Sequence, residues 1–147
     1  MAMYFESAVS YDKIQENGAV KKVTEKNLFD ALSFTEAESR TIEELTPYMS
    51  GDFSVKVCKR TKIAEVFFNE NTDRFYLVNV AFITLNENTG AEKQAVTQIL
   101  VQANDFDGAV SAFKEGMKQT MADWKILSVA ETPYMGVYPA KLSGDGV

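Results

Sequence analysis

Two segments decide the fold, because "SFTEAESRTIEELTPYM" (residues 33–49) and "DFDGAVSAFKEGMKQTM" (residues 105–121) carry the same pattern. Each begins with a residue, Ser33 or Asp105, whose side-chain oxygen can accept an otherwise unpaired backbone N–H at a helix N-terminus. Glu36, three residues after Ser33, completes a capping-box pattern. Each segment then places apolar or small residues at helical spacing: Phe34, Ala37, Thr41 and Leu45 in the first, and Phe106, Ala109, Phe113 and Met117 in the second. The sequence therefore predicts two helices, each with one apolar face.

The repetition extends along most of the chain. With a shift of 71 residues, "YFESAVSY" (residues 4–11) aligns with "FYLVNVAF" (residues 75–82), and the spacing of aromatic residues matches. The shift is 72 across the helices and returns to 71 after them. This pattern predicts a tandem duplication of a β-β-α-β unit, with repeats at residues 1–68 and 74–138 that form one compact domain, and a flexible tail at 139–147.

Alternation along the strands predicts which side chains face the helices. The residues expected on those faces are Phe5, Ser7, Val9 and Tyr11 in the first repeat and Tyr76, Val78, Val80 and Phe82 in the second. "ENGAV" and "NENTGA" supply the Asn and Gly of hairpin turns into strands at residues 19–31 and 92–103. Residues 74–85 are apolar on both faces, which is typical of a central strand. The expected fold is α+β, with two sheets or units packed with pseudo-twofold symmetry, and a homodimer is plausible.

The amino-acid composition excludes several classes of function. The chain has 147 residues, one cysteine (Cys58) and no histidine, so Cys/His zinc sites, intramolecular disulfides and imidazole catalysis are excluded. No nucleophile with a base, no convergent carboxylates and no phosphate-binding glycine loop are found, so we expect a protein that is not an enzyme and needs no metal or cofactor. The sequence shows neither a long apolar run nor a signal-peptide pattern, and it predicts a cytoplasmic location and no membrane association.

Basic residues gather in the first repeat although the net charge is −6. The stretch "FSVKVCKRTKIAEVFF" (residues 53–68) has alternating apolar positions whose pattern slips at residues 59–62, which indicates a bulge or bend. Single-stranded nucleic acid needs cations for its phosphates and flat rings for its bases. The predicted nucleic-acid-binding residues are Lys56, Lys59, Arg60, Lys62, Lys21, Lys22 and Lys26 for the backbone, and Tyr4 and Phe75 for stacking. The structural alternative is a solvated strand face with its rings in the core.

Several longer strings resemble a known family. "YFESAVSYDKIQENGAVKKVTEKNLFDALSFTEAESRTIEEL", "TKIAEVFFNE" and "VAFITLNENTGAEKQ" together resemble an uncharacterised domain-of-unknown-function family of Bacteroides-type bacteria, their phages and mobile elements. The resemblance covers roughly residues 3–138. It implies a phage or mobile-element setting in such a bacterium and assigns no catalytic residue.

Three functions stay open at this point. The first is a non-catalytic protein that binds single-stranded DNA or RNA in replication or recombination, and it has the most specific residues behind it. The second is an assembly module or one that binds a host or phage protein, including an anti-defence factor. The third is a protein that sequesters a nucleotide or another small molecule.

Overall fold

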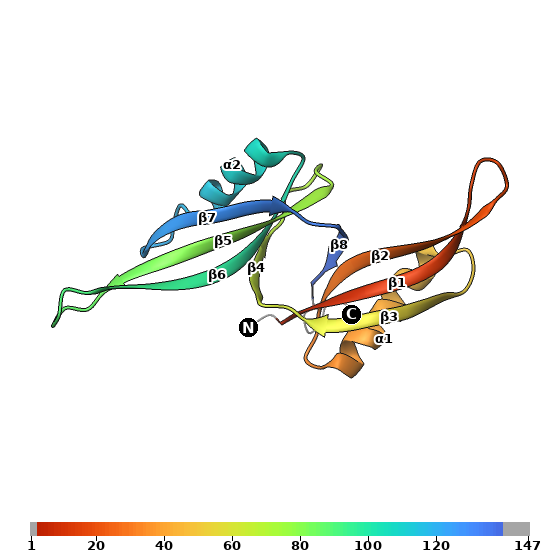
Figure 1. The fold of residues 1–147 in the computed structure, drawn as a ribbon, viewed down its shortest axis with the longest axis horizontal. Helices are drawn as coiled ribbons and strands as arrows, with labels where there is room; N and C mark the ends of the chain where they lie inside the picture. The colour runs from red at the N-terminus through yellow and green to blue at the C-terminus, as the bar shows by residue number, and fades with distance from the viewer. Residues whose placement is uncertain (1–2, 140–147) are drawn as a thin grey trace, which may run out of the picture. The chain divides into compact units, whose positions relative to one another are not determined.

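The computed structural model describes residues 3–139, and these residues form the α+β fold that the sequence predicts (Figure 1). In chain order the elements are β1 (Tyr4–Ile14), β2 (Val20–Asp30), α1 (Phe34–Leu45), the 3-10 turn η1 (Thr46–Tyr48), β3 (Phe53–Arg60), β4 (Ile63–Phe67), β5 (Arg74–Leu85), β6 (Glu92–Ala103), α2 (Phe106–Gly116), β7 (Asp123–Glu131) and β8 (Tyr134–Tyr138). Of the predicted tail, residues 140–147 lie outside the described residues.

The described strands form two four-stranded sheets. Sheet 1 has the order β3-β1-β2-β8, and sheet 2 has the order β7-β5-β6-β4. The outer strands β8 and β4 pair in parallel with β2 and β6, whereas the other neighbours are antiparallel. The described residues separate into two compact units, one made of residues 3–61 together with 133–139, and the other of residues 62–132. Each sheet therefore takes its parallel strand from the other half of the sequence.

The stretch at residues 53–68 forms two strands in different sheets, where the sequence predicted one strand with a bend. β3 ends where Thr61 donates both its backbone N–H and its hydroxyl to the carbonyl oxygen of Tyr4, at 2.9 and 2.8 Å. Thr132 makes the same two bonds to the carbonyl oxygen of Phe75, at 2.9 and 2.8 Å. Each threonine thus ends pairing in one sheet just before the chain enters the other.

Both predicted helix N-caps are confirmed. The Ser33 hydroxyl accepts from the Glu36 N–H at 3.1 Å, and the Asp105 carboxylate accepts from the Gly108 N–H at 2.7 Å. The Glu36 carboxylate accepts from the N–H of Leu32, one residue before the cap. The reciprocal half of the capping box is therefore displaced by one residue.

The predicted hairpins and the central strand are confirmed. Gly18 and Gly90 close the two turns at φ of 84° and 72°, a region in which glycine carries no Cβ penalty. They connect β1 to β2 and β5 to β6. β5 lies between β6 and β7, and its exposed residues are confined to its two ends, as its two apolar faces indicate.

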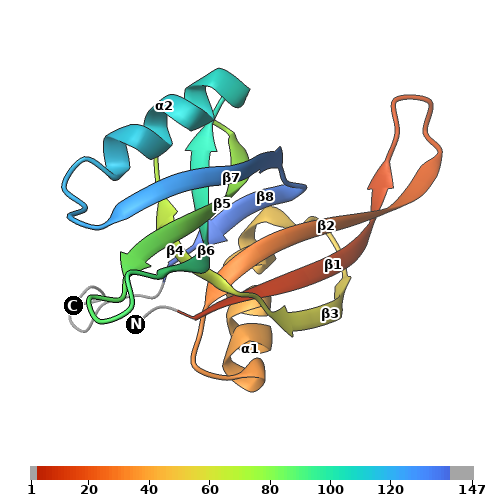
Figure 2. The ribbon, with the colours of Figure 1, turned by 60° about the vertical axis from the view of Figure 1, so that its left-hand side comes forward.

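The core of each unit lies between its helix and its sheet (Figure 2). In the first unit Phe5 packs with Ala37 of α1, and Val9 packs with Phe29 and Leu45. The ring of Tyr138, from β8, stacks on Phe29 with the centroids 4.8 Å apart. The parallel strand is thereby fixed to the first unit by side-chain packing as well as by its hydrogen bonds.

The second unit has the larger apolar cluster. Phe113 of α2 is fully buried, and its ring meets Trp124 of β7 edge-on at 5.3 Å. The other buried members of this cluster are Val78, Val80, Ile99, Val101 and Met117. In both sheets, the residues predicted to face a helix do so.

The first-turn phenylalanines depart from the predicted stripe. Phe34 and Phe106 are 56% and 53% exposed, whereas Ala37 and Ala109 are buried. The ring of Phe34 meets Phe5 only edge-on, at 5.1 Å. The buried face of each helix therefore begins one turn later than the apolar pattern suggests.

We expect Asp105→Ala to lower the free energy of unfolding by about 1 kcal/mol, because the Gly108 N–H loses its acceptor at the start of α2. Urea unfolding followed by the fluorescence of Trp124, which lies in the same unit, measures this change. Ser111→Ala, at an exposed position of the same helix, is the matched control and should shift stability by less than about 0.5 kcal/mol. Equal effects of the two substitutions would contradict the capping role.

Candidate nucleic-acid interface

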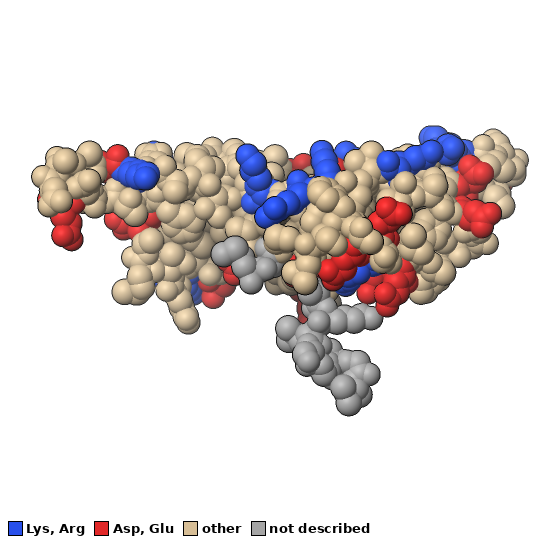
Figure 3. Space-filling view, turned by 90° about the horizontal axis from the view of Figure 1, so that it is seen from below, with Lys and Arg blue, Asp and Glu red and all other residues tan. Residues whose placement is uncertain are grey.

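Basic residues of the described strands are concentrated in sheet 1. Its strands carry seven Lys and Arg against four Asp and Glu, whereas the strands of sheet 2 carry three against four. The seven are Lys13, Lys21, Lys22, Lys26, Lys56, Lys59 and Arg60. Figure 3 shows blue Lys and Arg side chains in a row along the upper edge of the right-hand part of the view. An acidic protein therefore presents one basic sheet.

Three of these lysines share the face of sheet 1 that α1 does not cover. Because Phe5 and Val9 pack toward α1, the alternate residues of β1 point to the opposite face. Residues directly opposite in an antiparallel pair share a face, and the register places Lys22 opposite Asp12, Lys26 opposite Ala8 and Lys59 opposite Glu6. We call this surface the helix-free face, and its polar members are Glu6, Ser10, Asp12, Lys22, Thr24, Lys26, Ser54 and Lys59.

Glu6 lies at the centre of a charged cluster on this face. One carboxylate oxygen is 3.5 Å from the Nζ of Lys59 and 4.0 Å from the Nζ of Lys26. The other accepts a hydrogen bond of 2.8 Å from the hydroxyl of Tyr134, which β8 brings beside β2. Glu6 is only 7% exposed, and its partners offset the cost of removing its charge from water. The lysine ammonium groups remain near the surface, because the side chains of Lys26 and Lys59 are 43% and 62% exposed.

A row of hydroxyls crosses the same face between the lysines. Ser10 of β1 lies opposite Thr24 of β2 and Ser54 of β3. Thr24 and Ser54 are exposed. Ser and Thr hydroxyls are common donors to phosphate oxygens in nucleic-acid complexes. Ser10 itself is only 4% exposed, so the face combines its cations with the two accessible hydroxyls of Thr24 and Ser54.

The cluster has a measurable pH signature. Burial and the hydrogen bond to Glu6 raise the pKa of the Tyr134 phenol well above its usual value. The folded chain then holds this proton at pH values where the unfolded chain, with a phenol pKa near 10, releases it. The contribution of Tyr134 to stability is full below pH of about 10 and decreases as the pH rises further.

We expect the free energy of unfolding to fall less steeply above pH of about 10 in Tyr134→Phe than in the natural protein. The variant is also less stable at neutral pH, because the buried Glu6 loses a hydrogen-bond donor. Urea midpoints measured by circular dichroism on both sides of that pH give the two slopes. Identical slopes would show that Tyr134 does not hold its proton as the geometry indicates.

The remaining predicted cations lie elsewhere. Lys21 is opposite Lys13 and Arg60 is opposite Phe5, so both point to the helix side of sheet 1. Lys56 lines a hollow beside Phe34 at the start of α1. Lys62 belongs to the second unit. Of the seven predicted cations, the structure therefore brings Lys22, Lys26 and Lys59 together on the helix-free face.

The two predicted stacking rings are buried. Tyr4 is 6% exposed and Phe75 is 4% exposed, and the two residues belong to different units. Base stacking requires an accessible ring face. The expectation that these two rings stack on bases therefore needs correction, since both are core residues of their sheets.

Sequence reasoning missed Glu6 and Tyr134. Nothing in the local sequence pairs them, because they are 128 residues apart and meet through the parallel pairing of β2 with β8. The hydroxyls of Ser10, Thr24 and Ser54 could have been grouped from the two-residue period once the register was known. The lysines were found because charge clustering is visible along the chain.

Within residues 3–139, no group of His, Cys, Asp and Glu side chains has the arrangement of a metal site. Nor does any helix in that range have both the length and the apolar character needed to cross a membrane.

Comparison with known proteins gives one family. Residues 3–140 match the family described as "Domain of unknown function (DUF4494)". No curated protein matches the sequence.

Proposed function

The chain belongs to the DUF4494 family, and we propose that it is a non-catalytic protein that binds single-stranded nucleic acid on the helix-free face of sheet 1. The observation that carries the proposal is the placement of Lys22, Lys26 and Lys59 on one face of a sheet in an otherwise acidic protein. Lysine binds phosphate by displacing condensed counterions. The lysines contact the phosphate backbone of the nucleic acid, so binding is largely independent of base sequence.

The size of the basic surface favours a single strand over a duplex. Lys22 and Lys26 are four residues apart on β2, about 13 Å at the strand rise, so they can reach different phosphates. Duplex DNA carries about one charge per 1.7 Å, and tight duplex binders neutralise many phosphates at once. Three lysines with Glu6 and Asp12 among them match the lower charge density of a single strand.

The test is a fluorescence anisotropy titration of a labelled single-stranded oligonucleotide at several salt concentrations. The logarithm of the binding constant should fall linearly with the logarithm of salt, with a slope near −2, since about 0.7 counterions are released per neutralised phosphate in a single strand. A duplex of the same sequence should bind more weakly. An anisotropy that does not change during the titration would contradict the proposal. A rise in melting temperature with a mononucleotide, and none with oligonucleotides, would favour the small-molecule alternative.

We expect Glu6→Gln to increase the affinity for the oligonucleotide several-fold and to steepen the salt dependence. Gln keeps an oxygen for the Tyr134 hydroxyl but no longer holds Lys26 and Lys59 in ion pairs. Glu38→Gln, at an exposed position of α1, changes the net charge equally and serves as the control. Equal gains in both variants would mean that overall charge, and not the cluster, sets the affinity.

A duplication would explain why only one sheet is basic. The two sheets have corresponding strand orders, N-caps at Ser33 and Asp105, and paired hydrogen bonds from Thr61 and Thr132. We infer that a β-β-α-β unit was duplicated and that only the first copy kept the binding charge.

The proposed setting, replication or recombination of a phage or mobile element in the cytoplasm of a Bacteroides-type host, rests on the sequence resemblance alone. A homodimer remains part of this proposal, which size-exclusion chromatography with light scattering would test.

A further inference from the structure

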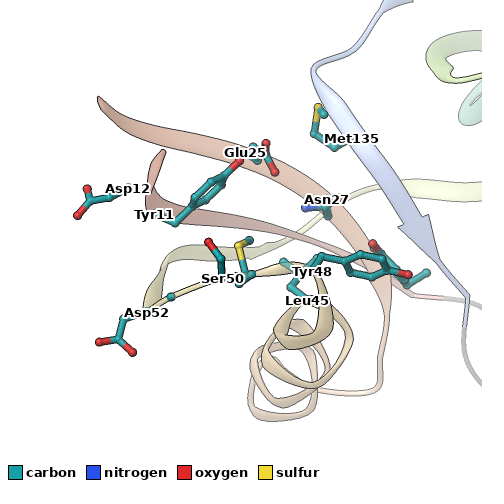
Figure 4. Close-up of a pocket in the computed structure, with 12 residues that line it drawn as sticks. Tyr11, Asp12, Glu25, Asn27, Leu45, Tyr48, Ser50, Asp52 and Met135 are labelled. Carbon is teal, nitrogen blue, oxygen red and sulfur yellow. Dashed lines mark hydrogen bonds between the residues drawn. The ribbon is translucent and has the colours of Figure 1, made fainter. Parts of the chain in front are cut away.

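A cavity of about 230 Å³ lies within the first unit, on the side of sheet 1 that faces α1. Its walls come from β1 and β2, from the end of α1 with the turn after it, and from β8. Figure 4 shows the strand residues Tyr11, Glu25 and Asn27 above Leu45 and Tyr48. Its volume is below the roughly 300–1,000 Å³ of pockets for drug-sized ligands, so it suits a smaller molecule.

The Asp, Glu, Lys and Arg residues that line the cavity among the described residues are all acidic. Among the described residues that line the cavity none is Lys or Arg, whereas Asp12, Glu25 and Asp52 are acidic. Glu25 belongs to the wall, whereas Figure 4 shows Asp12 and Asp52 at one end of the cavity with their carboxylates directed away from the other labelled side chains. Electronegative walls of this kind attract cations and repel phosphates.

Three tyrosines line the same space. Tyr11 donates its hydroxyl to the Glu25 carboxylate at 2.7 Å, which fixes the orientation of both side chains. Tyr138 is held by its stacking on Phe29, and Tyr48 is 77% exposed. Aromatic faces beside a carboxylate are the usual surroundings of bound ammonium and guanidinium groups.

The surrounding groups reinforce the negative potential. Burial, followed by the nearby Tyr48, Glu44 and Glu25, raises the pKa of the Tyr138 phenol. The nearest cation on α1, Arg40, is engaged with Glu44 at 3.6 Å and with the backbone oxygens of Tyr138 and Pro139. Arg40 therefore braces the end of β8 and does not line the cavity.

We propose that this cavity binds a small aliphatic cation that carries an ammonium or guanidinium group. The cationic head pairs with Glu25 and lies against the rings of Tyr48 and Tyr138, while the side chains of Leu45 and Met135 contact its methylene groups. The strand residues Tyr11, Glu25 and Asn27 lie on the α1 side of sheet 1, opposite to the helix-free face. Among the described residues that line the cavity, Asp12, at one end, is the one that also belongs to the helix-free face, and neither Lys26 nor Lys59 lines the cavity.

The test uses spermidine and agmatine as probes in isothermal titration calorimetry at low salt, with 1,4-butanediol as the neutral control. One probe per chain should bind, and the diol should give no heat. Glu25→Gln should weaken binding at least tenfold and Tyr48→Ala several-fold. Tyr11→Phe, which keeps the ring and releases Glu25 from its hydrogen bond, should bind as tightly as the natural protein or more tightly.

Glu87→Gln, on an exposed turn of the second unit, removes the same charge far along the chain and should leave the affinity unchanged. The proposal is overturned if neither cation binds, or if Glu25→Gln and Glu87→Gln weaken binding equally, since the attraction would then be diffuse. If Glu25→Gln fails to fold, Tyr48→Ala provides the test instead. The Tyr48 ring is largely exposed, so its removal should leave the fold intact, and unchanged binding of both probes by this variant would overturn the proposal. Charge reversal of Lys26 and Lys59 should not weaken binding of the probes, so this test and that of nucleic-acid binding can fail separately.

Discussion

Phe113→Ala should lower the free energy of unfolding of the second unit by about 3–5 kcal/mol. The Phe113 ring is fully buried between α2 and sheet 2, where it contacts Trp124 and Phe67 at centroid distances of 5.3 and 6.0 Å. Truncation removes the transfer energy of the ring and leaves a cavity that its rigid neighbours on the strands fill only in part. Folded domains are stable by about 5–15 kcal/mol, so a loss of this size removes a large share of the total.

Trp124 makes this prediction specific to one unit. It is the single tryptophan of the chain and packs directly on Phe113, so its fluorescence in a urea titration follows the second unit. Phe106→Ala is the matched control, because Phe106 lies on the same helix but is 53% exposed. Its effect should be under about 1.5 kcal/mol. Similar losses in the two variants would contradict the assignment of Phe113 to the core.

The second large effect concerns binding. Reversing three charges together, with Lys22→Glu, Lys26→Glu and Lys59→Glu, should reduce the affinity for single-stranded nucleic acid at least a hundredfold. This corresponds to about 2.8 kcal/mol of binding free energy, since each tenfold change is 1.4 kcal/mol. The reason is that the helix-free face loses its three cations and then repels the phosphate backbone.

A matched control comes from the second unit. Lys93→Glu, Lys114→Glu and Lys118→Glu change the net charge by the same amount at exposed positions outside sheet 1. Lys118 forms a surface ion pair with Glu115, whose loss costs at most about 1 kcal/mol. Circular dichroism melts of both triple variants separate lost binding from lost folding.

Local signals explain how much of the fold could be predicted. Ser33 and Asp105 mark helix starts by their side-chain chemistry, and Gly18 and Gly90 mark turns by their freedom at positive φ. The period of two along β1 identified the residues that pack on α1. In each case the deciding interaction lies within a few residues or within one element.

The exchange of parallel strands could not be predicted in the same way. Residues 53–68 contain no proline or glycine that marks a break, and the hydroxyl of Thr61 ends β3 through a bond to Tyr4, 57 residues earlier. The partner of β8 likewise lies more than 100 residues away in sequence. Such pairings depend on contacts between distant segments, which local patterns do not encode.

The candidate site was foreseen in part for the same reason. Lysines cluster along the chain and were found, whereas the burial of Tyr4 and Phe75 depends on the sheets around them. Glu6 resembled any polar residue of an alternating strand until the fold placed Lys26, Lys59 and Tyr134 around it. The sequence thus indicated the charge, and the fold determines which charges act together.

Nucleic-acid binding by the helix-free face is tested most directly by the binding constant of a fluorescein-labelled single-stranded oligonucleotide at low salt, compared between the natural protein and the two triple variants. The natural protein and the variant of Lys93, Lys114 and Lys118 should bind within a few-fold of each other, while the variant of Lys22, Lys26 and Lys59 should bind at least a hundredfold more weakly. Equal affinity in all three proteins, or no binding by the natural protein, would contradict a nucleic-acid interface on the helix-free face of sheet 1.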